Sequence, residues 1–216
     1  MDPQSTGDPQ STYDRIASHF AKTREYAWPE VESFLEGRSG GVALDVGCGN
    51  GRHTEALAAR VETAVGVDVS RGLLDEAVAR ARNRGYSDAT AFVHGDAAAL
   101  PVRGGAVDLA VYVATLHHLS PRAARVESLN ELARVLDPDG VALVSAWSTA
   151  HARFDRDEGF DTTVDWTLPG GETVPRFYHI YSPSEFAADL AASDLETRHE
   201  EVSSGNCYAE VTPRAP

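Results

Sequence analysis

Hydrophobic residues along this chain recur in two alternating rhythms. Short apolar runs of strand length are followed by stretches in which apolar residues return every three or four positions, as in a helix with one buried face. This pattern predicts strands at 42–46, 63–68, 90–94, 107–113 and 141–147, with helices between them at 52–60, 72–84 and 122–136. Strands alternating with helices of this length indicate βαβ crossovers, and therefore a mostly parallel sheet with helices on both faces.

The two ends of the chain depart from this alternation. Residues 13–36 carry two short amphipathic patterns, at 12–20 and 28–35, and we expect them to form a helical lid. The polar residues 1–12 are expected to be a disordered lead-in, and the acidic, weakly periodic stretch 148–175 to be an insertion or loop.

The segment that follows the acidic stretch predicts a helix at 183–192 and a final hairpin of strands at 195–202 and 206–211. The C-terminal strand is expected to run antiparallel to the others, which gives a seven-stranded sheet. Residues 13–216 would then form a single domain, a size and apolar content (42%) that suit one core better than two.

Composition narrows the class of protein. The longest apolar runs are far shorter than the roughly 20 residues of a membrane-spanning helix, and the polar start lacks the pattern of a secretory signal. Cys48 and Cys207 are far apart and form no metal-ligand cluster, so we expect no metal site, no disulfide scaffold and a reducing cytoplasm.

The net charge of −14 leaves two interpretations open. A surface with 33 acidic and 19 basic residues, of which only Lys22 is lysine, should repel nucleic acids and anionic membranes in dilute buffer. Alternatively, such acidity solvates a halophilic protein, because the Debye length falls to about 3 Å in molar salt and net charge then ceases to decide partners. We favour the second interpretation.

A glycine-rich turn follows the first predicted strand and opens the next helix. Glycines there allow unusual dihedral angles and the close approach of a ligand to the backbone. The third glycine falls one position too early for a dinucleotide fingerprint, and an aspartate before the turn suits a cationic ligand better than a pyrophosphate. The candidate ligand-binding residues here are Asp45, Gly47, Cys48, Gly49, Asn50 and Gly51.

Acidic residues also follow the next two strands. Asp68 and Val69 end the second strand, where a carboxylate can accept hydrogen bonds from both hydroxyls of a ribose. Asp96 and Ala97 follow the third strand, where a carboxylate and backbone groups can meet an adenine edge. Each piece alone could be an ordinary turn or helix cap, but their combination and order point to a nucleoside with a positively charged group.

The order of these motifs resembles that of the class I S-adenosylmethionine-dependent methyltransferases, whose glycine loop reads D-x-G-x-G-x-G. The resemblance covers about 42–147 and implies a Rossmann-like fold with S-adenosylmethionine as cofactor. The Asp137–Gly140 turn resembles the family's turn into its fifth strand, with Asp139 where glycine is common.

Candidate acceptor-binding residues fall in three segments outside the glycine loop. They are Tyr13, His19, Arg24 and Trp28 in the predicted lid, His117 and His118 after the fourth strand, and Arg176, Tyr178 and His179 further along.

Each of these segments also has a structural interpretation. His19 could simply pack the lid, and the histidine pair could cap the next helix. The stretch 176–181 could stack a base and hold phosphate, or form a half-buried strand. Arg24 is harder to explain by packing, because a lid arginine could clamp a carboxylate with two parallel hydrogen bonds.

Together, motifs in the lid, after the fourth strand and in the tail resemble the wobble-uridine tRNA methyltransferases. The motifs are Tyr13-Asp14-x-Ile16-Ala17-x-His19-Phe20-x-x-Thr23-Arg24, Trp28-Pro29, Leu116-His117-His118-Leu119-Ser120, Arg176-Phe177-Tyr178-His179 and Gly205-Asn206-Cys207-Tyr208. The resemblance implies transfer of a methyl group to a 5-carboxymethyl group on uridine, giving its methyl ester. Because a carboxylate is already ionised at neutral pH, no general base is needed, and Arg24 and His117 would orient the acceptor.

The resemblance also implies a partner, a small zinc-binding activator protein. We expect it to dock on the third strand, Thr90–His94, which would be a sheet edge with unpaired backbone groups. Two alternatives to a tRNA-modifying enzyme remain open: a methyltransferase of small molecules such as quinone precursors, and a non-enzymatic S-adenosylmethionine-binding regulator.

Overall fold

The computed structural model describes residues 8–215, which form alternating strands and helices. The α-helices are α1 (Pro9–Lys22), α2 (Pro29–Leu35), α3 (Arg52–Ala58), α4 (Arg71–Arg84), α5 (Arg122–Val135) and α6 (Pro183–Ala191), and the short 3-10 helices are η1 (Ser87–Ala89) and η2 (Leu116–His118). The strands are β1 (Gly40–Val46), β2 (Val61–Asp68), β3 (Thr90–His94), β4 (Val107–Val113), β5 (Leu136–Trp147), β6 (Phe160–Thr167), β7 (Thr173–Ile180), β8 (Leu195–Ser203) and β9 (Asn206–Pro213). No helix among the described residues is long and apolar enough to cross a membrane.

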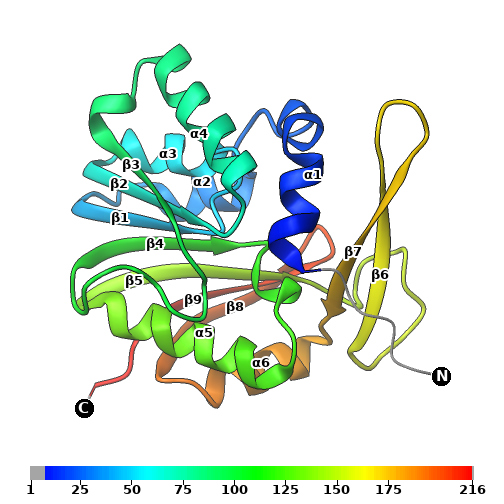
Figure 1. The fold of residues 1–216 in the computed structure, drawn as a ribbon. Coiled ribbons are helices and arrows are strands. Elements are labelled where there is room, and N and C mark those ends of the chain that lie inside the picture. Colours follow the sequence, from blue (N-terminus) through cyan, green and yellow to red (C-terminus); the bar gives the residue numbers. More distant parts are fainter. Residues whose placement is uncertain (1–7, 216) are drawn as a thin grey trace.

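Seven strands form one twisted sheet in the order β3-β2-β1-β4-β5-β9-β8 (Figure 1). Strands β1 to β5 pair in parallel, whereas β9 pairs antiparallel with β5 and β8 antiparallel with β9. The predicted Rossmann-like α/β fold and its antiparallel C-terminal strand are confirmed. The strand β3 lies at one end of the order, as expected for an edge.

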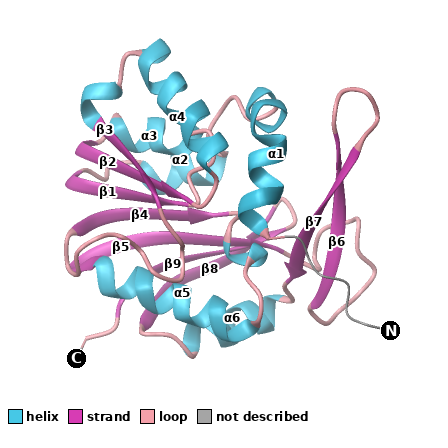
Figure 2. Ribbon diagram, viewed as in Figure 1, coloured by secondary structure: helices cyan, strands magenta, loops and turns pink. Residues whose placement is uncertain are grey.

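Two apolar layers, one on each face, hold the sheet between helices (Figure 2). On one face, Phe34 and Leu35 of α2 and Leu57 of α3 pack over the sheet. On the other, Leu129 of α5 and Phe186 of α6 pack against the central strands. Because the parallel strands point the same way, the carboxyl ends of β1, β2 and β4 meet beside α1, which lies between the sheet and the β6–β7 hairpin (Figure 1).

The first helix begins earlier than the sequence pattern predicts. It starts at Pro9 rather than near Thr12, and the Asp8 side chain caps it by accepting a 3.2 Å hydrogen bond from the Ser11 amide. Part of the expected disordered lead-in is therefore helical. The rest of that prediction concerns residues 1–7, which lie outside the described residues.

Part of the segment expected to be a loop, 148–175, belongs to a second, two-stranded sheet. Strands β6 and β7 pair antiparallel from Phe160 opposite Ile180 to Thr167 opposite Thr173. Half-buried and exposed positions alternate along β6, the period of a strand with one covered face. Gly170 and Gly171 both have positive φ, +104° and +90°, and make the tight turn.

Candidate cofactor and acceptor site

A cavity lies where β1, β2, β3 and β4 end, beneath α1. It encloses about 1080 Å³ of empty space, its open mouth included, which is room for a nucleoside-sized ligand. Most of the predicted cofactor-binding residues line it: Gly47, Cys48, Gly49, Asn50, Asp68, Val69, Asp96 and Ala97. The predicted residues Asp45 and Gly51 do not line this cavity.

The glycine loop is shaped by close contacts that side chains would prevent. Gly47 has a φ of +70°, and a Cβ there would lie 2.2 Å from Thr115 Oγ1. A Cβ on Gly49, by contrast, would meet only the Phe20 ring, at 3.9 Å, because this position faces the cavity. The amides of Gly47 and Cys48 both donate to the Val67 carbonyl, which fixes the loop to the end of β2.

Asp45 lies beneath the loop rather than in the cavity. Its side chain is buried, and its Oδ2 accepts a 2.6 Å hydrogen bond from Thr54 Oγ1 on α3. Burial raises the pKa of this carboxyl group from 3.8 to about 7. The expected direct contact between Asp45 and the cofactor is therefore not supported, and its visible role is to join β1 to α3.

The other two acidic residues do face the cavity. Asp68 Oδ2 accepts from the Gly49 amide and its Oδ1 from the Ser70 amide, both at 2.8 Å, so each oxygen keeps a further lone pair for a ligand hydroxyl. Asp96 Oδ1 accepts from the Ala98 amide at 2.9 Å, and no described residue donates to its second oxygen. Both carboxylates therefore lie at the cavity, where their positions after β2 and β3 predict them.

The lid helix is attached to the loops that surround the cavity. Asp14 Oδ1 accepts from the Ser70 hydroxyl at 2.7 Å and from the Gly72 amide at 2.9 Å. At the other end of the lid, Asn50 Nδ2 donates to the carbonyls of Ala21, at 3.2 Å, and Arg24, at 2.8 Å. Asp14 was part of the lid motif, but its contact with the α4 N-terminus could not be read from the sequence.

Two cavity-lining side chains, Arg52 and His53, lack polar partners that S-adenosylmethionine would supply. The buried His53 Nε2 has no hydrogen-bond partner among the described residues. Its neighbour Arg52 makes no ion pair with a described residue, and its guanidinium instead stacks 5.0 Å from the Trp28 ring centroid. A methionine carboxylate would complement both groups, and Asp68 is placed for a ribose, so the residues present fit this cofactor.

On the acceptor side of the cavity, His118 is held in one tautomer. Its Nδ1 lies 2.9 Å from the Phe177 carbonyl and must donate to it, which leaves Nε2 to accept from the Tyr13 hydroxyl at 2.8 Å. Burial lowers the pKa of His118 to about 4. This imidazole is therefore neutral at physiological pH, and both of its nitrogens are occupied.

His117, expected to orient the acceptor, is instead part of the core. It does not line the cavity, and its Nδ1 accepts a 2.9 Å hydrogen bond from the Trp147 amide. Burial holds the pKa of His117 well below 6.5. Of the two histidines, His118 and not His117 faces the site, because the chain turns into η2 after β4 and the strand alternation no longer applies.

Three further candidates serve packing in this structure. His19 Nδ1 accepts from Trp166 Nε1 at 3.0 Å, which joins the lid to β6, and Trp28 packs against Arg52 and His53. His179 is buried away from the cavity.

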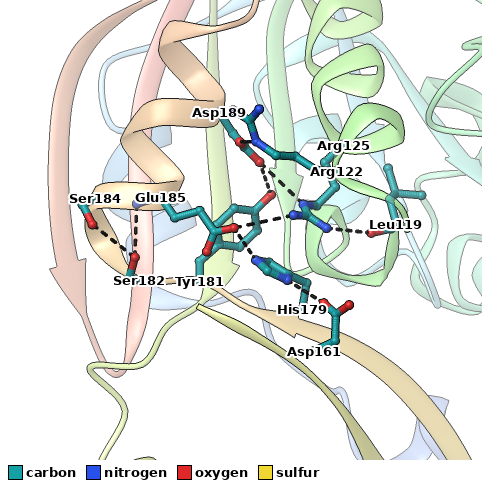
Figure 3. Close-up of polar contacts among 10 residues, drawn as sticks. All are labelled: Leu119, Arg122, Arg125, Asp161, His179, Tyr181, Ser182, Ser184, Glu185 and Asp189. Atoms are coloured by element: carbon teal, nitrogen blue, oxygen red, sulfur yellow. Dashed lines mark hydrogen bonds and ion pairs between the residues drawn. The ribbon is translucent and has the colours of Figure 1, made fainter. Parts of the chain in front are cut away.

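His179 belongs to a network of charged and polar groups that joins the β6–β7 hairpin to α5 and α6 (Figure 3). Its Nδ1 lies 2.7 Å from Asp161 Oδ1 and its Nε2 lies 2.9 Å from Glu185 Oε1. Beyond Glu185, Arg125 and Asp189 continue the network. An acceptor-binding role for His179 is not supported, because both ring nitrogens already have carboxylate partners.

The remaining candidates gather beside the cavity behind Tyr13. The Tyr178 ring contacts the rings of His117 and His118, at centroid distances of 5.0 and 4.4 Å. Arg176 stacks on Tyr178, and Arg24 stacks on Phe20, a cavity-lining residue. The aromatic residue Trp166, which the sequence reasoning did not select, lies against both guanidinium groups.

Comparisons with known proteins agree with this geometry. Residues 44–144 match the model of a methyltransferase domain family. The chain is 38% identical over 138 residues to the mouse tRNA (carboxymethyluridine(34)-5-O)-methyltransferase ALKBH8, covering 63% of this chain but only 19% of that protein. It is 32% identical over 202 residues to a putative methyltransferase of Encephalitozoon cuniculi, covering 88% of this chain and 90% of that one.

Two solved structures with the same fold are named as methyltransferases. The CcbJ methyltransferase from Streptomyces caelestis has a TM-score of 0.78 at 19% identity and covers 96% of this chain and 100% of that one. A putative methyltransferase in complex with the Haloferax volcanii Trm112 methyltransferase activator has a TM-score of 0.70 at 14% identity and covers 97% of this chain and 99% of that one. The cavity, its cofactor-matched residues and these relatives show that the chain belongs to the class I S-adenosylmethionine-dependent methyltransferases.

Proposed function

We propose that this protein methyl-esterifies a 5-carboxymethyl group on the wobble uridine of tRNA. The observation that carries the proposal is the state of His118, the imidazole on the acceptor side of the cavity. Its Nε2 is occupied by the Tyr13 hydroxyl and its pKa is about 4, so it is not available to take a proton. A phenol or alcohol acceptor would need such a base, whereas a carboxylate needs none.

The reaction then requires binding and alignment more than proton transfer. When bound, S-adenosylmethionine supplies a methyl group on a sulfonium. An acceptor carboxylate oxygen forms the new O–C bond as the C–S bond breaks and its electron pair stays on sulfur. Asp68 would hold the ribose, Asp96 and Ala97 the adenine, and Arg52 with His53 the methionine carboxylate. The lid and the Tyr13 and Phe20 rings would exclude water and align the two reactants.

Relatives support the tRNA substrate, and the charge of the surface sets the conditions for it. The mouse relative named above is a tRNA (carboxymethyluridine(34)-5-O)-methyltransferase, although this chain spans only 19% of its length. A net charge of −14 would oppose tRNA binding in dilute buffer, but screening at molar salt shortens the reach of that repulsion to about 3 Å. We infer that the protein works in high salt.

The test is an incubation with labelled S-adenosylmethionine and tRNA from cells that lack the methyl ester, in high salt. We expect label in tRNA that mild alkali releases as methanol, because an ester is hydrolysed and an N-methyl or ring C-methyl group is not. Label in small metabolites instead would favour the alternative acceptor class. Cofactor binding without transfer to either would favour a regulator.

We infer further that a small zinc-binding activator docks along β3. This strand is the sheet edge next to β2, with Ala91 and His94 exposed and its outer backbone groups unpaired by any strand among the described residues. An incoming strand could satisfy those groups. The structural relative solved in complex with the Haloferax volcanii Trm112 methyltransferase activator makes such a partner a concrete candidate.

Co-purification in high salt tests the docking site. Ala91→Arg places a long side chain on the β3 edge and should abolish capture of a co-expressed activator. His199→Arg adds the same side chain to an exposed position of β8, the opposite edge, and should leave capture unchanged. Capture that survives Ala91→Arg would rule out this edge.

A further inference from the structure

Two arginines on the acceptor side have no acidic partner. Arg176 on β7 is only 7% exposed, yet its Nε has no hydrogen-bond partner, and no described carboxylate pairs with it. Arg24 is half-buried and donates only to the carbonyl and hydroxyl of its neighbour Thr23, at 3.2 and 3.1 Å. Elsewhere in the fold, the similarly buried Arg125 lies 3.5 Å from Asp189 and 3.7 Å from Glu185 (Figure 3).

The two guanidinium groups share one aromatic ring. The Cζ atoms of Arg176 and Arg24 lie 4.9 and 5.8 Å from the Trp166 ring centroid. Each also stacks on a second ring, Arg176 on Tyr178 at 5.2 Å and Arg24 on Phe20 at 4.9 Å. Burial lowers the pKa of Arg24, and the nearby charge of Arg176 adds to this effect. Both guanidinium groups therefore lie within stacking distance of one ring, Trp166, and each is held against a second ring as well.

Keeping two cations here without an anion is costly. A buried charge that lacks a counter-ion loses hydration with no compensation, so a site of this kind stays charged when a ligand supplies the missing anion. Arg52, which also lacks an acidic partner, lines the cavity at the glycine loop and belongs to the cofactor end. Arg176 and Arg24 lie beside the part of the cavity that Phe20 and His118 line: Arg24 stacks on Phe20, and Arg176 stacks on Tyr178, whose ring contacts His118.

We propose that Arg176 and Arg24 together form the receptor for the carboxylate of the methyl acceptor. Arg176 is only 7% exposed and stacks on Trp166 and Tyr178, so an anion that reaches it must be small. A carboxylate at the end of a short arm meets this condition, whereas a phosphodiester carries two chain substituents. The guanidinium fork also matches the planar, two-oxygen geometry of a carboxylate. This assignment rests on the proposed function and names the groups that select its acceptor.

The receptor would bind the substrate more tightly than the product. The acceptor is an anion before transfer, and the methyl ester formed is neutral. The ion pairs with Arg176 and Arg24 are therefore available to the substrate and lost in the product. We expect the product to bind more weakly than the substrate, as would an uncharged amide of the same shape.

The test compares two RNAs against two forms of the protein. The probes are anticodon stem-loops with 5-carboxymethyluridine or the isosteric 5-carbamoylmethyluridine at the wobble position, bound in the presence of S-adenosylhomocysteine at fixed high salt. Wild-type protein should prefer the carboxylate by about 10- to 100-fold, the range expected for charge-assisted hydrogen bonds. Arg176→Gln should lose most of this preference, because only Arg24 then remains to meet the carboxylate, and Arg176→Lys should restore part of it.

Matched controls separate this role from a structural one. Arg156 is exposed and stacks 4.4 Å from the Phe160 ring in the β6 segment, so Arg156→Gln removes an equivalent stacked arginine and should keep the full preference. The dissociation constant for S-adenosylmethionine should be unchanged in Arg176→Gln, which shows that the variant is folded and its cofactor end intact.

The outcomes separate the carboxylate receptor from the proposed tRNA-methylating function. A wild-type protein that methylates tRNA, together with an Arg176→Gln variant that keeps the wild-type preference for the carboxylate, would overturn the receptor alone. A wild-type protein that neither methylates tRNA nor prefers the carboxylate would overturn the proposed function and the receptor with it. Loss of the preference in Arg176→Gln with unchanged cofactor binding would support both.

Discussion

Asp45→Asn should make the protein more stable at neutral and alkaline pH. The carboxyl group is 1% exposed, and its single side-chain partner is Thr54, so burial raises its pKa from 3.8 to about 7. Below pH 3.8 the folded and unfolded states both carry the proton, and ionisation costs nothing. Between pH 3.8 and about 7 the unfolded chain releases its proton while the folded protein keeps it, so stability falls as pH rises.

The size of the effect follows from that difference in pKa. Each pKa unit corresponds to about 1.4 kcal/mol, so a shift of roughly three units costs the folded state about 4 kcal/mol once both states are ionised. Asparagine cannot ionise and still offers an oxygen to Thr54. The variant should recover up to about 4 kcal/mol at pH 8 and less than about 1 kcal/mol at pH 4, where the folded aspartate is protonated and the unfolded one has only begun to ionise.

Urea unfolding of the cofactor-free protein at pH 4, 6 and 8 and constant salt measures this difference. Asp108→Asn is a suitable control, because Asp108 Oδ2 accepts from the Gly41 and Val42 amides at 2.7 and 2.9 Å and benefits from its charge. That variant should gain no stability at any pH. If Asp45→Asn were less stable than wild type at pH 8, the conclusion that burial makes ionised Asp45 costly would be refuted.

Three other predictions concern the cavity. Gly47→Ala should lower stability by about 2 to 4 kcal/mol and abolish cofactor binding, because its Cβ would lie 2.2 Å from Thr115 Oγ1. Gly85→Ala, at a similar φ of +78° but with open space around the Cβ, should cost only about 1 kcal/mol, and thermal melts compare the two variants. Asp68→Ala should weaken S-adenosylmethionine binding by at least about tenfold, since it removes an acceptor for both the ligand and two loop amides, and calorimetry that finds unchanged affinity would contradict this. The rate of methyl transfer should show no inflection between pH 6 and 8 from His118, whose pKa is about 4, so a bell-shaped profile centred near 7 would point to a base that the site does not visibly supply.

The cofactor half of the site was predictable because it follows from sheet geometry. Glycines and carboxylates at the ends of consecutive parallel strands must meet at one edge, so their sequence positions gave their spatial positions. This logic placed Asp68 and Asp96 correctly. It failed for Asp45, whose position one residue inside the strand end points it under the loop, where burial and Thr54 claim it.

The acceptor half depends on contacts between distant segments, and the sequence specified it poorly. His117 and His118 are adjacent, and only the turn of η2 decides which one faces the cavity. The strand β6 falls in the predicted loop because aspartates stand between Phe160, Val164 and Trp166, although these apolar residues do recur at even spacing on one face. Most of β7 matches the half-buried strand that was one of two interpretations of 176–181. An alternation count over 160–167 would have detected the strand.

In the arrangement proposed above, the β6–β7 hairpin separates acceptor recognition from cofactor binding. Its Trp166 and Arg176 lie against one another beside the cavity, whereas the residues matched to the cofactor all come from the ends of the main sheet and its helices. The hairpin forms its own two-stranded sheet, joined to the main sheet's β5 end by a single bridge between Ser148 and Tyr181. Replacing the hairpin alone would therefore change the acceptor while leaving the cofactor-binding residues in place.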